Sequence, residues 1–330
     1  MLPKISVIIP VRNDAEVLRR CLESLRKVDY PKDSLEIIVV DGLSNDNSRA
    51  IAVSYGATVI TNDKKIVAPA RNIGYAAATG ELVAYIDADC VVDSGWLAKS
   101  VKYFDDPRVG GVSGPTLASP DSTLFEKAVE VIFNLSESFG VTAHRRRIRE
   151  IVQTDDLPGC NAIYRKSALD KVMPIDEHFV AADDSWISFR VRGAGYVLWF
   201  TPDVILWHYH HNPPRKFFYR MYRYGISRLQ AGKKDWRLLN VFYILFGFSI
   251  PIFLGAALIS YMTGLSSLFL FLTAASLVFI FLVGLAKTRS IIIALDLLWA
   301  SVLFSSGWSI GFLRELLFPL GMPKGGERNG

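Results

Sequence analysis

A long stretch of this chain, residues 238–313, is almost free of charge. Only Lys287, Arg289 and Asp296 carry a charge within it. It divides into three apolar windows, at about 238–262, 265–286 and 291–313, and each approaches the roughly 20 residues that a helix needs to cross a bilayer core. Three such windows in a row would be an unusual core for a soluble protein. The sequence therefore predicts three transmembrane helices, with Pro251 kinking the first.

The residues before this stretch have the composition of a soluble domain. The 330 residues include 37 Lys+Arg and 32 Asp+Glu, which gives a net charge of +5, and all but a few of these charges precede residue 238. So small and evenly spread an excess does not favour a nucleic-acid partner. The three cysteines are odd in number and far apart in the sequence, which fits a reducing compartment and no disulfide framework.

The segment just before the apolar stretch predicts the orientation in the membrane. Residues 215–237 hold eight Lys or Arg and one Asp, so the positive-inside rule places this segment in the cytoplasm. The chain start does not resemble a signal peptide, because its apolar run ends at Pro10 and no basic residues precede it. We therefore expect a multi-pass protein of the cell membrane whose first domain is cytoplasmic.

Aromatic residues alternate with the basic ones in this segment, which is typical of an amphipathic helix at a membrane interface. Arg220 and Arg223 are candidates for contacts with a membrane-borne substrate. A nucleic-acid groove is the competing interpretation, and the adjacent membrane span disfavours it. The expected divisions are a soluble domain at 1–212, an interface segment at 213–237, the membrane helices at 238–313 and a tail at 314–330.

In the soluble domain, apolar runs alternate with helical patterns. The runs Ile5–Ile9, Glu36–Val40, Ala57–Thr61 and Leu82–Ile86 are continuous, as expected where helices cover both faces of a sheet. The pattern predicts an α/β fold with a mostly parallel, Rossmann-like sheet in three layers. Ligands of such folds bind beyond the carboxyl ends of the strands.

Two acidic residues lie at this predicted edge. Asp87 and Asp89 directly follow the run Leu82–Ile86, and two such carboxylates can share one hard cation such as Mg²⁺ or Mn²⁺. The sequence contains neither of the usual glycine-rich phosphate loops, so a metal could hold a diphosphate instead. The alternative is a turn in which Asp89 caps the next helix.

Five motifs follow one another along the chain: Ser6–Asn13, Ile38–Asp46, Ala70–Gly74, Ala78–Glu81 and Tyr85–Asp89. In order and spacing, they resemble those of glycosyltransferase family 2 across about residues 4–210. The resemblance implies a GT-A fold, a nucleotide-diphosphate sugar donor, a Mn²⁺ or Mg²⁺ ion and inversion at the anomeric carbon. By motif position, it implies that Pro10 and Arg12 line the base pocket, that Asp41 holds the base or ribose, that Arg71 lies near the nucleotide, and that Asp87 and Asp89 bind the metal diphosphate.

The second half of the resemblance concerns the catalytic base. Where the family usually shows Glu-Asp-x-Asp-Leu-x-x-Arg, this chain has Asp183-Asp184, with Arg190 in register and Trp186 in place of the later acid. This departure leaves Asp183 and Asp184 as the candidates for the base, and we favour Asp184 by register. A sugar hydroxyl needs such a carboxylate to take its proton, on the face opposite the leaving group. The alternative is a pair that caps the following helix.

Three further residues have two interpretations each. His208 and His210 could add a metal or phosphate contact, or they could serve surface or packing roles. Trp96 could stack on a sugar, and core packing is the alternative.

These observations predict a membrane-bound inverting hexosyltransferase that acts in glycan biosynthesis. The expected acceptor is lipid-linked, either a polyprenyl or dolichyl phosphate or a diphosphate-linked saccharide. We slightly prefer GDP-mannose as donor, from the resemblance alone. A processive polysaccharide synthase is disfavoured because Gln230 and Trp236 lack the spacing of a Gln-x-x-Arg-Trp signature. A non-catalytic, sugar-nucleotide-binding membrane adaptor is disfavoured by the intact acidic clusters.

Overall fold

The computed structural model describes residues 2–137, 150–209 and 213–319. They belong to two compact units. Unit 1 comprises Met1–Pro120 and Ala143–His210, and unit 2 comprises Asp121–Thr142 and His211–Gly330. The segment 121–142, which the sequence placed in the soluble domain, thus belongs to unit 2.

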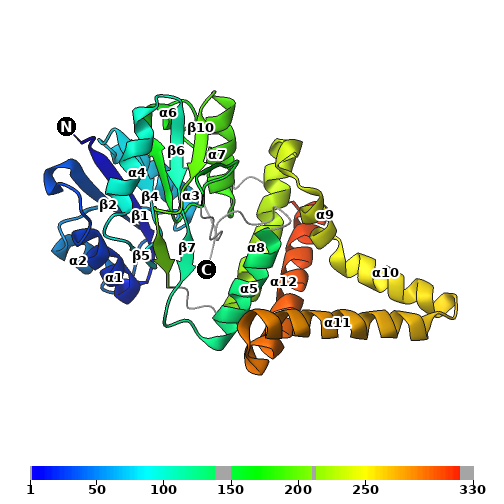
Figure 1. Cartoon of the computed structure of the whole chain (residues 1–330). Helices are drawn as coiled ribbons and strands as arrows, with labels where there is room; N and C mark the ends of the chain where they lie inside the picture. Colours follow the sequence, from blue (N-terminus) through cyan, green and yellow to red (C-terminus); the bar gives the residue numbers. More distant parts are fainter. Residues whose placement is uncertain (1, 138–149, 210–212, 320–330) are drawn as a thin grey trace. The chain divides into compact units, whose positions relative to one another are not determined.

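Unit 1 is built around an eight-stranded sheet (Figure 1) with the strand order β3-β2-β1-β4-β9-β6-β10-β8. The β1–β2, β2–β3, β1–β4 and β6–β10 pairs are parallel, whereas β9 runs antiparallel to β4 and β6, and β8 runs antiparallel to β10. The predicted mostly parallel sheet is therefore confirmed. The strands are β1 (Ile5–Val11), β2 (Leu35–Asp41), β3 (Thr58–Thr61), β4 (Leu82–Tyr85), β6 (Val109–Ser113), β8 (Val152–Gln153), β9 (Ala162–Arg165) and β10 (Val197–Phe200).

Two hydrophobic cores, one on each face of this sheet, make the three layers. In β1, Ile5, Val7 and Ile9 belong to the first core and Ile8 to the second, because successive side chains of a strand point to opposite faces. The first core includes residues of α1 (Ala15–Arg26), α2 (Ser48–Ser54) and α4 (Trp96–Val101), and the second includes residues of α3 (Val67–Ala77), α6 (Lys166–Leu169) and α7 (Asp183–Gly193). Two short 3₁₀ helices, η1 (Lys32–Ser34) and η2 (Lys102–Asp105), complete the unit.

A second, smaller sheet extends from the end of β4. Its strands are β5 (Cys90–Val92), β11 (Leu206–His208) and β7 (Thr116–Ala118), in that order. The β5–β11 pair is antiparallel and places His208 opposite Cys90. This small sheet therefore brings residues from distant parts of the chain next to the acidic residues that follow β4.

Unit 2 is helical. Its helices are α5 (Leu124–Glu137), α8 (Pro214–Lys234), η3 (Trp236–Leu238), α9 (Val241–Gly247), α10 (Ser249–Met262), α11 (Ser266–Thr288) and α12 (Ile291–Leu317). Helices α8 and α12 approach each other closely. A Cβ atom on Gly311 of α12 would lie only 2.0 Å from the carbonyl oxygen of Tyr222 on α8. Phe217 and Met221 of α8 are fully buried in the same core as Phe133 of α5 and Phe304 of α12. The segment predicted to lie at an interface thus also buries one face against other helices.

Within the described residues, α11 and α12 are long and apolar enough to cross a membrane. They correspond to the second and third predicted windows. The first window forms α9 and α10, which could make a third span as a pair but are bent by 61° relative to each other. Helices α10 and α11 form a hairpin (Figure 1), and large apolar side chains on it, such as Leu270 and Phe279, are 66% exposed.

The bend between α9 and α10 has an identifiable cause. Proline lacks an amide proton and clashes with the carbonyl four residues earlier, which for Pro251 is the carbonyl of Gly247, the last residue of α9. That carbonyl instead accepts a hydrogen bond of 2.8 Å from the Ser309 hydroxyl on α12. The expected kink is present, and it lies at the turn before Pro251.

Candidate active site

The ends of β1 and β2 form one part of the carboxyl edge of the sheet. Asp41 is the last residue of β2, lies opposite Val11 and is buried. Its Oδ1 accepts a hydrogen bond of 3.2 Å from the Ser44 amide, and the Arg49 guanidinium lies 3.8 Å from Oδ2. The following loop is thereby folded back over the strand end.

The loop after β1 is tied to the same place. The Ser44 hydroxyl accepts from the Asn13 amide at 2.9 Å, and Asn13 Oδ1 accepts from the Asn45 amide at 2.7 Å. Asn13 has a φ of 53°, which asparagine tolerates better than most residues. Pro10 is half-buried and Arg12 is exposed, with its stem over Gly42. The residues predicted to surround the base are therefore neighbours, and contact with a nucleotide remains a prediction.

The second part of the edge is an acidic group beside one histidine. Ligand atoms of Asp87, Asp89 and His208 lie within 4.8 Å of one another. The His208 Nε2 lies 2.8 Å from Asp89 Oδ1. Two carboxylates and one imidazole suit a Mn²⁺ ion, and with open positions they also suit Mg²⁺. His210, the other predicted ligand, lies outside the described residues.

Burial and charge perturb this group strongly. Burial raises the pKa of Asp87, and the nearby Cys160 and Asp89 raise it further. Burial lowers the pKa of His208, but Asp89 and Cys160 together outweigh this effect and raise the pKa to about 10. Without a cation, the cluster therefore compensates its negative charge with protons, and a bound cation would replace them.

The third part is the acidic pair that opens α7. The N-cap position is Ala182, so Asp183 and Asp184 lie in the first turn of the helix, where the helix dipole favours negative charge. Asp183 forms a buried ion pair with the Arg71 guanidinium. Asp184 instead accepts hydrogen bonds from the amides of Gly159, at 3.0 Å, and Ser185, at 2.8 Å. The two carboxylates thus differ in their described partners: Asp184 accepts from backbone amides, whereas Asp183 pairs with a guanidinium.

Arg71 connects the two acidic clusters. Its side chain is buried and its Nη2 would lie 2.1 Å from a Cβ atom on Gly159, so a larger residue at position 159 would displace the guanidinium. Burial lowers the pKa of Arg71, and this effect is outweighed by three carboxylates, those of Asp183, Asp184 and Asp87. Carboxylates from sequence regions about 95 residues apart thus share the field of one guanidinium. Arg71 was predicted to lie near the nucleotide, and its described partner is Asp183.

Three other predicted residues have different surroundings. Trp96 is fully buried, and its indole Nε1 donates to Asn161 Oδ1 at 2.8 Å, so it packs in the core and offers no ring face to a sugar. In unit 2, the Arg220 guanidinium lies over the rings of Phe133 and Phe217, at 5.1 and 5.5 Å. Arg223 is exposed. Acceptor contacts of these two arginines remain predictions.

No role was predicted for the loop before β9, which lies between the two clusters. The Gly159 amide binds Asp184, and the next residue, Cys160, lies near Cys90 and His208. The amide group of Asn161 is buried and donates to the carbonyl oxygens of Gly114 and Val204, at 2.9 and 3.0 Å. A buried Asn with every contact satisfied is a strong positional constraint. A Gly-Cys-Asn run directly before a strand was the available signal.

Comparison with known proteins decides the family. Residues 6–173, about half of the chain, match the profile of Glycosyl transferase family 2. The chain belongs to this family. It is therefore a glycosyltransferase, and its unit 1 has the GT-A fold.

Similar proteins extend this result. The chain is 28% identical over 244 residues to Glycosyltransferase AglE of Haloferax volcanii, covering 71% of this chain and 76% of that protein. It is 24% identical over 261 residues to a dolichyl N-acetyl-alpha-D-glucosaminyl phosphate 3-beta-D-2,3-diacetamido-2,3-dideoxy-beta-D-glucuronosyltransferase of Methanococcus voltae, covering 74% and 78%. It spans about half the length of two other relatives, from Bacillus subtilis and Mycobacterium tuberculosis.

A solved structure resembles nearly the whole chain. It is the mannosyltransferase PcManGT from Pyrobaculum calidifontis in complex with GDP-Man and Mn²⁺, with a TM-score of 0.65 at 22% identity, covering 92% of this chain and 87% of that one. At this identity the likeness supports the shared fold.

Proposed function

We propose that this glycosyltransferase is a metal-dependent, inverting hexosyltransferase that transfers a hexose from a nucleotide-diphosphate donor to a lipid-linked acceptor. The observation that carries the proposal is the arrangement around Arg71. Asp87 belongs to a group that suits a divalent cation, and Asp184 belongs to a pair that suits a base. Both lie close enough to raise the pKa of this one guanidinium.

The two clusters have separate tasks. Asp87, Asp89 and His208 would hold a divalent ion, which supplies charge compensation for the leaving nucleoside diphosphate. Asp184 would accept the proton of the acceptor hydroxyl as the new bond to the anomeric carbon forms. Inversion requires that this carboxylate face the side of the sugar opposite the diphosphate. Gly159 fixes one oxygen of Asp184 through its amide and thereby sets the direction of the other.

The remaining residues would position the substrates. Asp41 would bind the base or ribose, with Pro10 and Arg12 lining that pocket. Arg71 would hold Asp183 and keep the two acidic clusters in register, because removing a guanidinium from among buried carboxylates leaves them uncompensated. This is a positioning role, and it does not require Arg71 to contact the donor.

The donor and acceptor follow from different observations. GDP-mannose is our choice of donor because a structure that resembles nearly the whole chain is that of a mannosyltransferase in complex with GDP-Man and Mn²⁺. A lipid-linked acceptor is supported by the apolar helices α11 and α12 and by the relative whose name includes a dolichyl phosphate substrate. We place unit 1 in the cytoplasm because eight basic residues precede the first apolar window.

A donor panel tests this proposal. The purified full-length protein in detergent is mixed with Mn²⁺ and with each of several nucleotide sugars, and the thermal midpoint is measured. A donor at 100 times its Kd should stabilise the fold by about 2.7 kcal/mol, and GDP-mannose should give the largest shift. The stabilising donor should then release its nucleoside diphosphate when a polyprenyl-diphosphate-linked saccharide, which offers sugar hydroxyls, is added, and EDTA should stop the release. Release that continues fully in EDTA would contradict the metal role.

A further inference from the structure

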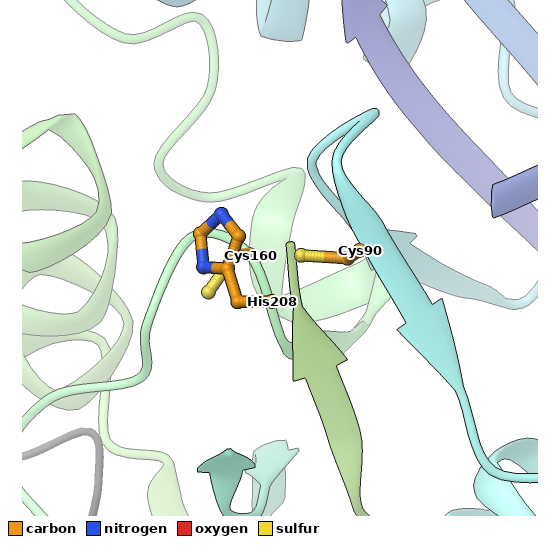
Figure 2. A group of neighbouring side chains, drawn as sticks. All are labelled: Cys90, Cys160 and His208. Carbon is orange, nitrogen blue, oxygen red and sulfur yellow. The ribbon is translucent and has the colours of Figure 1, made fainter. Parts of the chain in front are cut away.

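Two cysteines, Cys90 and Cys160, lie beside His208. Neither of them has a role in the proposed reaction. Cys90 is the first residue of β5 and His208 the last residue of β11, and the antiparallel register places them directly opposite each other. Such partners have Cβ atoms about 4.5–5.5 Å apart. Cys160 reaches the same place from the loop before β9 (Figure 2), and ligand atoms of the three residues all lie within 4.8 Å of one another.

The third member of this group is held in place by its neighbours. Cys160 lies between Gly159, whose amide binds Asp184, and Asn161, whose amide group binds two buried carbonyl oxygens. Its sulfur lies 3.8 Å from the hydroxyl of Thr116, at the start of β7. Since β7 pairs with β11, the loop and the small sheet fix each other. The arrangement of two sulfurs and one imidazole is therefore preorganised.

The imidazole is also oriented as a metal ligand would be. His208 Nε2 lies 2.8 Å from Asp89 Oδ1, and the ring is hydrogen-bonded to the Cys160 thiol as well. Histidines that bind a metal through one nitrogen usually donate the other to a carboxylate, which fixes the ring. In Figure 2 the sulfur of Cys160 lies beside the His208 ring, and the sulfur of Cys90 points toward the pair.

These ligands differ in kind from those of the proposed catalytic cation. Thiolate and imidazole ligands select Zn²⁺ and similar ions, whereas carboxylates suit Mg²⁺ and Mn²⁺. Zinc-to-sulfur bonds of about 2.3 Å in a tetrahedral site place two sulfurs about 3.8 Å apart, a separation compatible with the observed spacing. The carboxylates of Asp87 and Asp89 add negative charge nearby, which favours any cation.

We propose that Cys90, Cys160 and His208 form a second metal site, selective for a thiophilic divalent ion such as Zn²⁺, that shares His208 with the carboxylates of Asp87 and Asp89. Binding forms two sulfur–metal bonds and one nitrogen–metal bond, and the two thiol protons and one proton of the His208 imidazolium pass to water. No electrons are transferred. A solvent molecule or Asp89 can complete the tetrahedron.

Sharing one imidazole makes the two sites antagonistic. When His208 binds a thiophilic ion, it no longer serves the oxygen-ligated cation beside it. Zn²⁺ should therefore lower sugar transfer supported by Mn²⁺. The existence of the thiolate site does not depend on the proposed function, whereas this inhibition does, so the two are measured separately.

Cobalt spectroscopy tests the site directly. The full-length protein, reduced with a phosphine and held in detergent, is titrated with Co²⁺. A thiolate site produces an intense sulfur-to-cobalt charge-transfer band and visible bands typical of tetrahedral Co²⁺, whereas Co²⁺ on carboxylates alone produces no sulfur band. We expect the band to saturate at one Co²⁺ per chain and to disappear when Zn²⁺ is added.

Three variants locate the site. Cys160→Ser and Cys90→Ala should each reduce the charge-transfer band at least tenfold at equal Co²⁺. Cys160 is only partly buried, so its variant is expected to fold, and an unchanged thermal midpoint checks this. Cys21→Ala is the matched control, because Cys21 is a buried thiol of unit 1 whose sulfur contacts the Asp87 carbonyl and lies outside the group. Its band should equal that of the wild type.

Each outcome has one meaning. The absence of a charge-transfer band from the folded wild-type protein, or a band that survives in both Cys90→Ala and Cys160→Ser, would overturn the proposal. If the band is present and Zn²⁺ leaves transfer unchanged, the site stands and the antagonism is wrong. In Cys160→Ser, the Zn²⁺ concentration that halves transfer should rise at least tenfold. A protein that shows the band but transfers no sugar would contradict the proposed function alone.

Discussion

The two edges of the main sheet in unit 1 both hold carboxylates, but the surroundings shift the pKa values of these carboxylates in opposite directions. At the amino edge, Glu36 accepts hydrogen bonds from the Ser6 hydroxyl and from the amide and hydroxyl of Thr79, at 3.0 and 3.1 Å. Burial raises the pKa of Glu36, and these hydrogen bonds lower it by more, so the net pKa lies below its usual value. At the carboxyl edge, the pKa of Asp87 is raised by burial and by neighbouring negative charge.

The difference between these pKa shifts distinguishes carboxylates that stabilise the fold from carboxylates that serve function. A carboxylate whose charge is satisfied by fixed donors stabilises the fold. A carboxylate that is buried beside others of its own charge stores unfavourable energy that a cation can relieve. Removing the charge of Glu36 should therefore lower stability and leave turnover unchanged, whereas removing the charge of Asp184 or Asp89 should impair the reaction or cation binding without lowering stability. The following predictions test this contrast, beginning with the largest effect.

The substitution Asp184→Asn should affect turnover most. Without the base, the rate of sugar transfer should fall by about 10²–10⁴, while the Kd for the donor should stay within a factor of three or so of the wild-type value, because the change leaves the cation ligands intact. Single-turnover transfer and donor binding are the two measurements. Asp155→Asn, at an 86% exposed side chain outside the site, serves as the control and should behave like the wild type. Turnover equal to the wild type in Asp184→Asn would exclude the base assignment.

The substitution Asp89→Asn should weaken the cation site. It removes one ligand and also the carboxylate that orients His208, so Mn²⁺ affinity should fall by at least the factor of about 10–100 seen for second-shell changes. Titration calorimetry with Mn²⁺ measures this loss. The thermal midpoint without metal should be unchanged or higher, because a source of charge repulsion has been removed. A lower thermal midpoint together with unchanged Mn²⁺ affinity would contradict this prediction, because Asp89 would then serve stability and not cation binding.

The substitution Arg71→Met should reduce stability. It leaves Asp183 as a buried charge without its guanidinium, and breaking such a pair costs about 3–5 kcal/mol. Both side chains are less than one-tenth exposed. Denaturant unfolding of the protein in detergent measures the change. The double variant Arg71→Met with Asp183→Asn should recover part of the loss, because the uncompensated charge is gone. Single and double variants of equal stability would show that the pair does not hold the clusters together.

The substitution Glu36→Gln should have the smallest effect, a loss of about 1 kcal/mol in stability at pH 7, as expected for weakened hydrogen bonds, with unchanged turnover. Because the folded-state pKa of Glu36 lies below its unfolded value, its contribution is complete above the unfolded pKa of about 4.3. It is lost as the pH falls through the lower, folded-state pKa. Thermal midpoints of variant and wild type between pH 3 and 7 should therefore converge at the acid end, and a difference independent of pH would contradict this assignment.

The sequence was most informative where a pattern is local. The continuous apolar runs predicted the mostly parallel sheet, and the uncharged stretch predicted α11 and α12. The dipeptide Asp183-Asp184 indicated a base from its motif register, but the sequence did not show that Asp183 is held by Arg71. That distinction depends on a contact between residues 112 positions apart.

Other features could not be predicted for the same reason. Cys90 and Cys160 are far apart in the sequence, yet the register of β5 with β11 and the loop before β9 place them beside the same histidine. The antiparallel strand β9 in a parallel sheet carries Gly159, Cys160 and Asn161 to the edge. Trp96 gave no local sign that its indole nitrogen would meet Asn161 in the core.

A structure of the protein with Mn²⁺ and its donor would test the central claim most directly. Anomalous scattering should place Mn²⁺ between the diphosphate and the carboxylates of Asp87 and Asp89. An oxygen of Asp184 should face the anomeric carbon from the side opposite the diphosphate, with room for one hydroxyl at about 2.6–3.2 Å from that oxygen. Mn²⁺ bound elsewhere, or Asp184 on the same side as the leaving group, would contradict the account.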